Sequence, residues 1–251
     1  MVEIWLWTEK QDIGPSPRGW HAMTYDSEKQ KTLLVGGYSP DLNKMLNDTW
    51  EWDGKFWTQV AHTGPSLRVV HSMAFDSEKK KTVLFGGWNG SITFNDTWEW
   101  DGIEWTQVAH TGPSLRVVHS MAFDSEKKKT VLFGGWNGSI TLNDTWEWDG
   151  IEWTQVADTG PPRSYHSMVF DSEKKKTVLF GGRDDSKPVN DTWEWDGKFW
   201  TQRQDMGPQP RELHSMAYDI QRQRTVLFGG LSNSSYYTAD TWELKIETYQ
   251  E

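Results

Sequence analysis

Short apolar segments separated by polar turns make up most of the chain, and residues 64–111 show their order. Residues 71–76 alternate apolar with polar side chains, a pattern typical of a strand with one buried face. Residues 77–81 are polar and predict a hairpin turn, and the continuous apolar run 82–85 predicts a strand buried on both faces. Together the segments predict an antiparallel hairpin whose second strand lies inside the protein.

Two further strands complete this unit. Gly86-Gly87 ends the apolar run, which indicates backbone angles or a close approach that a side chain would forbid. After a short loop, residues 96–101 alternate again and place their two tryptophans on one face. Asp101-Gly102 predicts a turn, and residues 104–108 predict a fourth strand. One unit is therefore expected to be a four-stranded antiparallel sheet.

The same unit occurs five times, with successive copies 47 to 50 residues apart. Each copy has a glycine pair followed by Asp-Thr-Trp-Glu, and the pairs begin at Gly36, Gly86, Gly134, Gly181 and Gly229. A repeat of this length buries its apolar faces by stacking on its neighbours, so we expect one domain over residues 1–251. The expected copies span about 14–63, 64–111, 112–159, 160–206 and 207–251.

Copies two and three differ only at Phe94 against Leu142 and at His110 against Asp158. Natural repeats normally diverge more, so this near-identity favours either a recent duplication or a deliberately built sequence.

Four short strands per copy, a Gly-Gly after the second strand and spaced aromatics ending in a tryptophan resemble the kelch family of β-propellers. The resemblance covers nearly the whole chain. It implies an all-β, five-bladed β-propeller of four-stranded antiparallel blades. Kelch propellers more usually have six or seven blades, so the narrower ring leaves the family's site positions uncertain here.

The last copy ends without a fourth strand of the Trp-Thr-Gln type, and a similar segment occurs at the other end. Residues 4–9 align with 55–59, so we expect the N-terminal strand, about 3–9, to complete the last blade. Such closure removes exposed sheet edges and ties the termini together.

Composition narrows the classes of partner. A net charge of -10 argues against nucleic acid or an anionic membrane, and no run of 18 apolar residues occurs. The absence of cysteine excludes disulfides and thiolate chemistry and leaves the compartment open. We expect a soluble monomer, cytoplasmic or secreted after removal of a signal.

The kelch resemblance places the loop before each first strand and the loop after each Gly-Gly around one mouth of the central channel. Guanidinium groups and aromatic rings there could hold an acidic peptide, a small anion or a sugar. The candidate binding residues are Arg18, Trp20, Tyr38, Arg68, Trp88, Arg116, Trp136, Arg163, Tyr165, Arg183 and Arg211.

A structural role is the competing interpretation for the residues that every copy repeats. The repeated arginine would pair with a carboxylate, and the repeated histidine three residues later would bond to backbone. If this segment is extended, the two side chains point to opposite faces. The variable aromatic positions and Arg183 are then better candidates for contact, and a specific partner should favour copies four and five, which diverge most.

Three other repeated sets also receive a structural interpretation. The glutamates between tryptophans (Glu51, Glu99, Glu147, Glu194 and Glu243) need a cation, either the repeated arginine or a lysine of the first hairpin. The fourth-strand tryptophans (Trp57, Trp105, Trp153 and Trp200) are expected between blades. The five histidines (His21, His71, His119, His166 and His214) suit no common metal geometry, so we predict neither a metal nor another cofactor.

No nucleophile elbow, phosphate-binding loop or zinc motif occurs. The sequence therefore favours a non-enzymatic binding or protein-interaction module. The alternatives are a structural or engineered repeat scaffold without an evolved ligand and a kelch-type enzyme, such as a metal-dependent lyase or oxidase.

Overall fold

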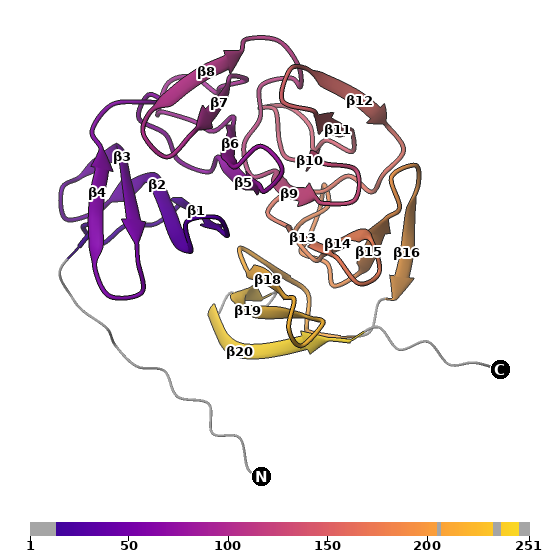
Figure 1. Cartoon of the computed structure of the whole chain (residues 1–251). Coiled ribbons are helices and arrows are strands. Elements are labelled where there is room, and N and C mark those ends of the chain that lie inside the picture. The colour runs from indigo at the N-terminus through magenta and orange to yellow at the C-terminus, as the bar shows by residue number, and fades with distance from the viewer. Residues whose placement is uncertain (1–13, 205–206, 233–236, 246–251) are drawn as a thin grey trace.

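Five four-stranded antiparallel sheets stand around a central channel in the computed structural model (Figure 1). The structure describes residues 14–204, 207–232 and 237–245. Within these residues every regular element is a strand. The described part of the chain holds no helix with the length and apolar character needed to cross a membrane. The predicted all-β propeller with five blades is confirmed.

The first four blades share one strand order, from the first strand beside the channel to the fourth strand at the outer edge of the ring. Blade 1 contains β1 (Ala22–Asp26), β2 (Lys31–Ser39), β3 (Lys44–Trp52) and β4 (Trp57–Ala61). Blade 2 contains β5 (Ser72–Asp76), β6 (Lys81–Phe85), β7 (Thr97–Trp100) and β8 (Trp105–Ala109). Blade 3 contains β9 (Ser120–Asp124), β10 (Lys129–Phe133), β11 (Thr145–Trp148) and β12 (Trp153–Ala157). Blade 4 contains β13 (Ser167–Asp171), β14 (Lys176–Phe180), β15 (Thr192–Trp195) and β16 (Trp200–Gln204).

Blade 5 differs at its two edges. It contains β17 (Arg211–Glu212), β18 (Ser215–Asp219), β19 (Arg224–Ser232) and β20 (Tyr237–Leu244). The two-residue β17 pairs with the end of β19, where the other blades have single bridges. The outermost position in the sheet, which β4, β8, β12 and β16 occupy in their blades, has no counterpart beside β20 among the described residues. The N-terminal strand predicted for that position lies outside them.

The pattern of blade 2 shows why these segments are strands. Ser72 pairs with Phe85 across the hairpin, and Leu84 pairs with Trp98 on the other side of β6. These pairings occupy the two edges of β6. Its two faces are buried between blades, with Leu84 in one core cluster and Val83 and Phe85 in another, as the continuous apolar sequence predicts. A register shift between Thr97 and Trp98 marks a bulge where the third strand meets the fourth.

The core lies between blades, where the fourth-strand tryptophans were expected. Trp105 packs against Leu33 and Val35 of blade 1, and its Nε1 donates to Thr49 Oγ1 at 2.9 Å. Trp153 forms the equivalent contact with Thr97 of blade 2. This part of the prediction is confirmed, and blades 1 to 3 each receive an indole from the next blade.

The buried glutamates of the third strands pair with lysines of the first hairpins. Lys31 Nζ lies 2.7 Å from a carboxylate oxygen of Glu51, and Lys81 Nζ lies 2.8 Å from one of Glu99. Glu147 and Glu194 also pair with hairpin lysines, so of the two cations considered from the sequence the lysine is used in blades 1 to 4. Glu243 of blade 5 pairs with Arg222 of its hairpin.

Neighbouring blades also share backbone hydrogen bonds that repeat along the ring. The second glycine of each pair donates to the arginine carbonyl of the next blade, as in Gly37 N to Arg68 O at 3.1 Å. The same bond recurs from Gly87, Gly135 and Gly182, so it links blades 1 to 5 in sequence. Among the described residues, no such bond joins blade 5 to blade 1.

Candidate functional site

The two loops expected at the mouth lie side by side. In blades 1 to 4 the residue after the arginine forms a bridge to the residue after the glycine pair, as in Val69 with Trp88. Two backbone hydrogen bonds of 2.9 and 3.0 Å close this pair. In blade 5 the equivalent contact is β17 with β19. We call these paired loops of the five blades the mouth. Backbone hydrogen bonds hold the two loops of each blade together.

The residue two positions after each arginine adopts a left-handed backbone conformation. The five residues are Trp20, Val70, Val118, Tyr165 and Leu213, with φ between 53° and 62°. Such angles cost a non-glycine residue about 1–3 kcal/mol and persist only where the surroundings impose them. Here a chain of backbone bonds imposes them: Val70 N donates to Trp20 O, and each following residue of the set donates to the one before, at 2.9–3.2 Å. The mouth therefore has a rigid inner rim.

Aromatic side chains on this inner rim and on the loops bridged to it remain accessible. The exposed fractions are 56% for Trp20, 38% for Trp88 and 44% for Trp136. Trp20 stands beside Tyr38, with ring centroids 6.0 Å apart. Tyr165 is partly covered, and burial raises the pKa of its hydroxyl, with the carboxylate of Glu212 acting in the same direction. Three indoles and two phenols thus flank the channel entrance.

The repeated arginines lie below the rim and face carboxylates inside their own blades. Arg116 is 0% exposed, and its guanidinium donates to both oxygens of Asp144 at 2.7 and 2.8 Å and to Gly134 O at 2.9 Å. The corresponding pairs are Arg18–Asp48, Arg68–Asp96, Arg163–Asp191 and Arg211–Asp240. A carboxylate partner is what the structural interpretation of this set required.

The charge of Asp144 fits this pairing. Burial alone would raise the pKa of its carboxyl, but hydrogen bonds from Arg116 and Trp146 and the arginine's charge outweigh burial and lower the pKa. The pair is therefore ionised and bidentate, and the arginine connects the first glycine of its blade with the loop of the preceding one.

The expectation for the directions of the arginine and histidine assumed an extended segment, and Val70 between Arg68 and His71 is left-handed, so the segment is not extended. Both side chains are buried. Neither repeated side chain is therefore an exposed feature of the mouth.

Arg183 differs from the repeated arginines because it occupies the tryptophan position of blade 4. Its side chain is 41% exposed, and Nη1 lies 3.4 Å from a carboxylate oxygen of Glu212 in blade 5. Leu213, which the sequence did not single out, is 40% exposed at the same rim. Leu213 could have been found from the sequence, because it stands two residues after a repeated arginine, as Trp20 and Tyr165 do.

The channel continues beneath the mouth. A cavity of about 460 Å³ is lined by His21, His71 and the serines and methionines of the first strands, and a second of about 550 Å³ continues toward the hairpin turns. Burial, then the charge of the neighbouring arginine, lowers the pKa of His71 to about 3 and that of His214 to about 4. The same causes hold the pKa values of His119 and His166 well below the usual range.

The histidines are therefore neutral at pH 7. Within the described ranges, no three or more His, Asp or Glu side chains are grouped so that they could hold a metal ion.

A comparison with protein families matches residues 3–160 to the model described as the KLHDC2/KLHL20/DRC7 Kelch-repeats domain. The match covers more than half of the chain. The comparison with curated proteins found no match.

Proposed function

The chain belongs to the kelch-repeat family, and on that premise we propose that it is a non-enzymatic protein-interaction module that holds a peptide segment of its partner at the mouth. Kelch propellers typically act as protein-interaction modules. The proposal concerns the place and chemistry of contact: Trp20, Tyr38, Trp88 and Trp136 supply aromatic surface, and Arg183 supplies the accessible cation.

The observation that carries this proposal is a set of exposed indoles on hydrogen-bonded backbone: Trp20 in the left-handed inner rim, and Trp88 and Trp136 in the loops that are bridged to it. Tryptophan, tyrosine and arginine are enriched among the residues that contribute most to binding at protein interfaces. Tryptophan and tyrosine bury a large area with only two rotatable side-chain bonds. A rim fixed by backbone bonds has little conformational entropy left to lose on binding. These indoles are thus pre-organised for contact.

The buried arginines sharpen the expected ligand class. Their guanidinium groups already face aspartates, so in this proposal Arg18, Arg68, Arg116, Arg163 and Arg211 maintain the mouth while the aromatic residues touch the ligand. Asp184 and Asp185 follow Arg183 in the chain, and Glu212 forms an ion pair with it, so all three add negative charge to this part of the mouth. An extended peptide with aromatic or basic side chains suits this surface better than a small anion.

The test compares two double variants in the nearly identical blades 2 and 3. Trp88→Ala with Trp136→Ala removes two indoles from the mouth. Ile103→Ala with Ile151→Ala is the matched control, since both isoleucines are 81% exposed in turns at the opposite end of the third strands. The probes are acidic, basic and aromatic peptides, simple sugars, phosphate and sulfate, assayed by thermal shift.

We expect a peptide to raise the melting temperature of the wild type and of the isoleucine variant but not that of the tryptophan variant. A shift that survives in the tryptophan variant would place binding elsewhere. If a sugar, and no peptide, stabilised the wild type and the isoleucine variant but not the tryptophan variant, the ligand class would be a sugar. No shift with any probe would favour the alternative of a repeat scaffold without a ligand, which the near-identity of copies two and three also suggests.

A further inference from the structure

The end of the channel opposite the mouth, at the turns of the first hairpins, holds a cavity of about 550 Å³. The first strand of every blade contributes one aromatic side chain to its lining. We call these five residues the aromatic collar: Tyr25, Phe75, Phe123, Phe170 and Tyr218. Small-molecule sites commonly have volumes of about 300–1,000 Å³, so the collar surrounds room for a small ligand.

A carboxylate follows each collar residue directly, because the first strands all end in aspartate. Three of these side chains, those of Asp76, Asp124 and Asp171, are only 1–6% exposed. Burial raises the pKa of the Tyr218 hydroxyl, and the charge of Asp171 in the preceding blade acts in the same direction. The ring of Tyr218 therefore lies close to a carboxylate of the neighbouring blade.

The contacts of Asp76 show how these carboxylates are held. Its Oδ1 accepts the backbone N–H groups of Glu78 and Lys79 at 3.0 and 2.9 Å, which fixes the hairpin turn. Its Oδ2 is buried and has no hydrogen-bond donor among the described residues, although Lys79 Nζ lies 3.6 Å away. Buried charge is screened less than surface charge, so negative charge acts on the collar from beneath.

The lysines of these hairpins reach away from the channel. In blades 1 to 3 the first lysine of the turn donates to a backbone carbonyl in an outer turn of the next blade. These bonds run from Lys29 to Gly102, from Lys79 to Asp149 and from Lys127 to Gly197. The lysine that follows pairs with a glutamate of the preceding blade, as Lys80 does with Glu28 at 2.6 Å.

Other aromatic rings at this end of the molecule already have a cation. Phe56 and Phe199, in turns between the third and fourth strands, each have a lysine Nζ over the ring, 4.9 and 5.0 Å from the centroid. Across the part of the chain that the structure describes, no lysine or arginine lies over a collar ring in this way. The face of an aromatic ring attracts positive charge, so the collar and its carboxylates together suit a cation from outside the chain.

We propose that the aromatic collar is a binding site for a methylated ammonium group. Such a group fits the ring faces of several aromatic side chains at once. A primary ammonium is a compact and strongly hydrated charge, so it loses more on leaving water than a methylated one does. This site lies at the other end of the channel from the peptide contact proposed at the mouth and does not depend on it.

The first test measures binding to the full chain by isothermal titration calorimetry. The probes are choline, its neutral tert-butyl analogue, and a short peptide with either trimethyllysine or lysine. We expect choline to bind at least about tenfold more tightly than the neutral analogue. Equal affinities would overturn the proposal, and so would the absence of binding by both choline and the trimethyllysine peptide at millimolar concentration.

The two methylated probes distinguish the sources of the group. Binding of choline identifies a small molecule as sufficient. Binding of the trimethyllysine peptide without binding of choline identifies a methylated lysine side chain of a protein. In both cases the lysine peptide should bind at least about tenfold more weakly than the methylated probe.

The second test locates the site with two matched double variants. Phe123→Leu with Phe170→Leu removes two collar rings and keeps apolar side chains. Phe56→Leu with Phe199→Leu makes the same change in outer turns, where the rings are 52% and 56% exposed. We expect the bound methylated probe to lose about tenfold in affinity in the collar variant and nothing in the control. Equal effects, or no loss in the collar variant, would overturn the proposal.

A single variant keeps the test valid if the collar double variant does not fold. Tyr25 is 56% exposed, so Tyr25→Leu removes a collar ring without changing the buried core. We expect this change to weaken binding of the methylated probe about threefold. An unchanged affinity would count against the collar as the site.

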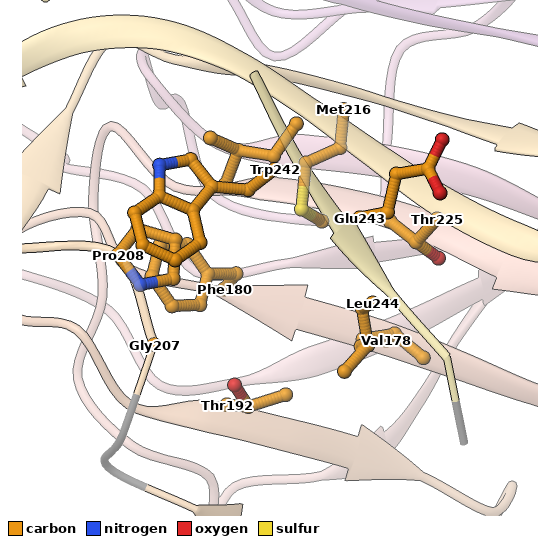
Figure 2. Close-up of a pocket in the computed structure, with 11 residues that line it drawn as sticks. Val178, Phe180, Thr192, Gly207, Pro208, Met216, Thr225, Trp242, Glu243 and Leu244 are labelled. Atoms are coloured by element: carbon orange, nitrogen blue, oxygen red, sulfur yellow. The ribbon is translucent and has the colours of Figure 1, made fainter. Parts of the chain in front are cut away.

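An apolar pocket elsewhere in the chain provides a further distinction. It has a volume of about 240 Å³, lies between blades 4 and 5, and is lined by Phe180, Pro208 and Trp242 among others (Figure 2). A small apolar molecule fits such a pocket, and its binding there would survive loss of the collar rings. Binding of choline that survives in the collar variant would therefore overturn the proposal.

Discussion

Acidification should destabilise this propeller well above the pH at which carboxylates titrate, because four histidines are buried without charge. His71, His119, His166 and His214 are 6–7% exposed, and their pKa values in the folded chain are far below 6.5. In the unfolded chain they titrate near 6.5, so between pH 6.5 and about 4 the unfolded state binds more protons. Stability is therefore complete above pH 6.5 and falls as pH decreases through this window.

The magnitude follows from linkage. One unit below the unfolded pKa, each such histidine costs about 1.4 kcal/mol, since its protonation in the folded state is negligible there. Four histidines together remove about 6 kcal/mol between pH 7.5 and pH 5.5 on that scale. A typical domain is stable by about 5–15 kcal/mol, so this loss is a large share of the total.

Urea unfolding followed by tryptophan fluorescence at several pH values measures this loss directly. His119→Leu, which keeps an apolar side chain of similar size, should reduce the loss at pH 5.5 by about a quarter, whatever it does to stability at pH 7.5. His110→Asn changes an exposed histidine and should leave the loss unchanged. A free energy of unfolding that stays constant from pH 7.5 to 5.5, or the same loss in His119→Leu, would refute the reasoning.

Three further changes test the fold. Arg116→Ala should cost about 3–5 kcal/mol in chemical unfolding, because it leaves the partly buried Asp144 carboxylate without its cation; a cost below about 1 kcal/mol would contradict this. Gly135→Ala should destabilise by several times as much as Gly138→Ala in the same assay: their φ angles are 97° and 98°, but a Cβ at Gly135 would lie 2.7 Å from a backbone carbonyl, and one at Gly138 meets nothing described within 4 Å. Lys80→Ala removes only an exposed ion pair and should change the free energy of unfolding by about 0.5 kcal/mol or less.

The strands and the contacts between blades could be predicted because each depends on local patterning or on the repeat. The continuous apolar run before Gly86 predicted the buried strand β6. The tryptophan that recurs at the position of Trp105 in each copy indicated a packing position that the blades share. A continuous apolar run allows one arrangement, because a strand with two apolar faces must be covered on both of them.

The partner of the repeated arginine could not be chosen in the same way. Each copy offers two carboxylates three residues apart, such as Asp96 and Glu99, and the sequence does not say which one the guanidinium reaches. The choice depends on the chain path around the left-handed glycines at 86 and 87 and around Val70. A left-handed valine has no sequence signal, because it is imposed by hydrogen bonds between blades.

The near-identity of blades has a consequence for how the chain folds. The second strands β6, β10 and β14 share the sequence Lys-Thr-Val-Leu-Phe, so β5 meets the same side chains in any of them. Only the length of chain between partners distinguishes the native hairpin from one that skips a blade, and loop closure favours the shorter connection by about 2 kcal/mol. We therefore expect refolding to include slow molecules in which an entire blade has been looped out and must unpair before the ring can form.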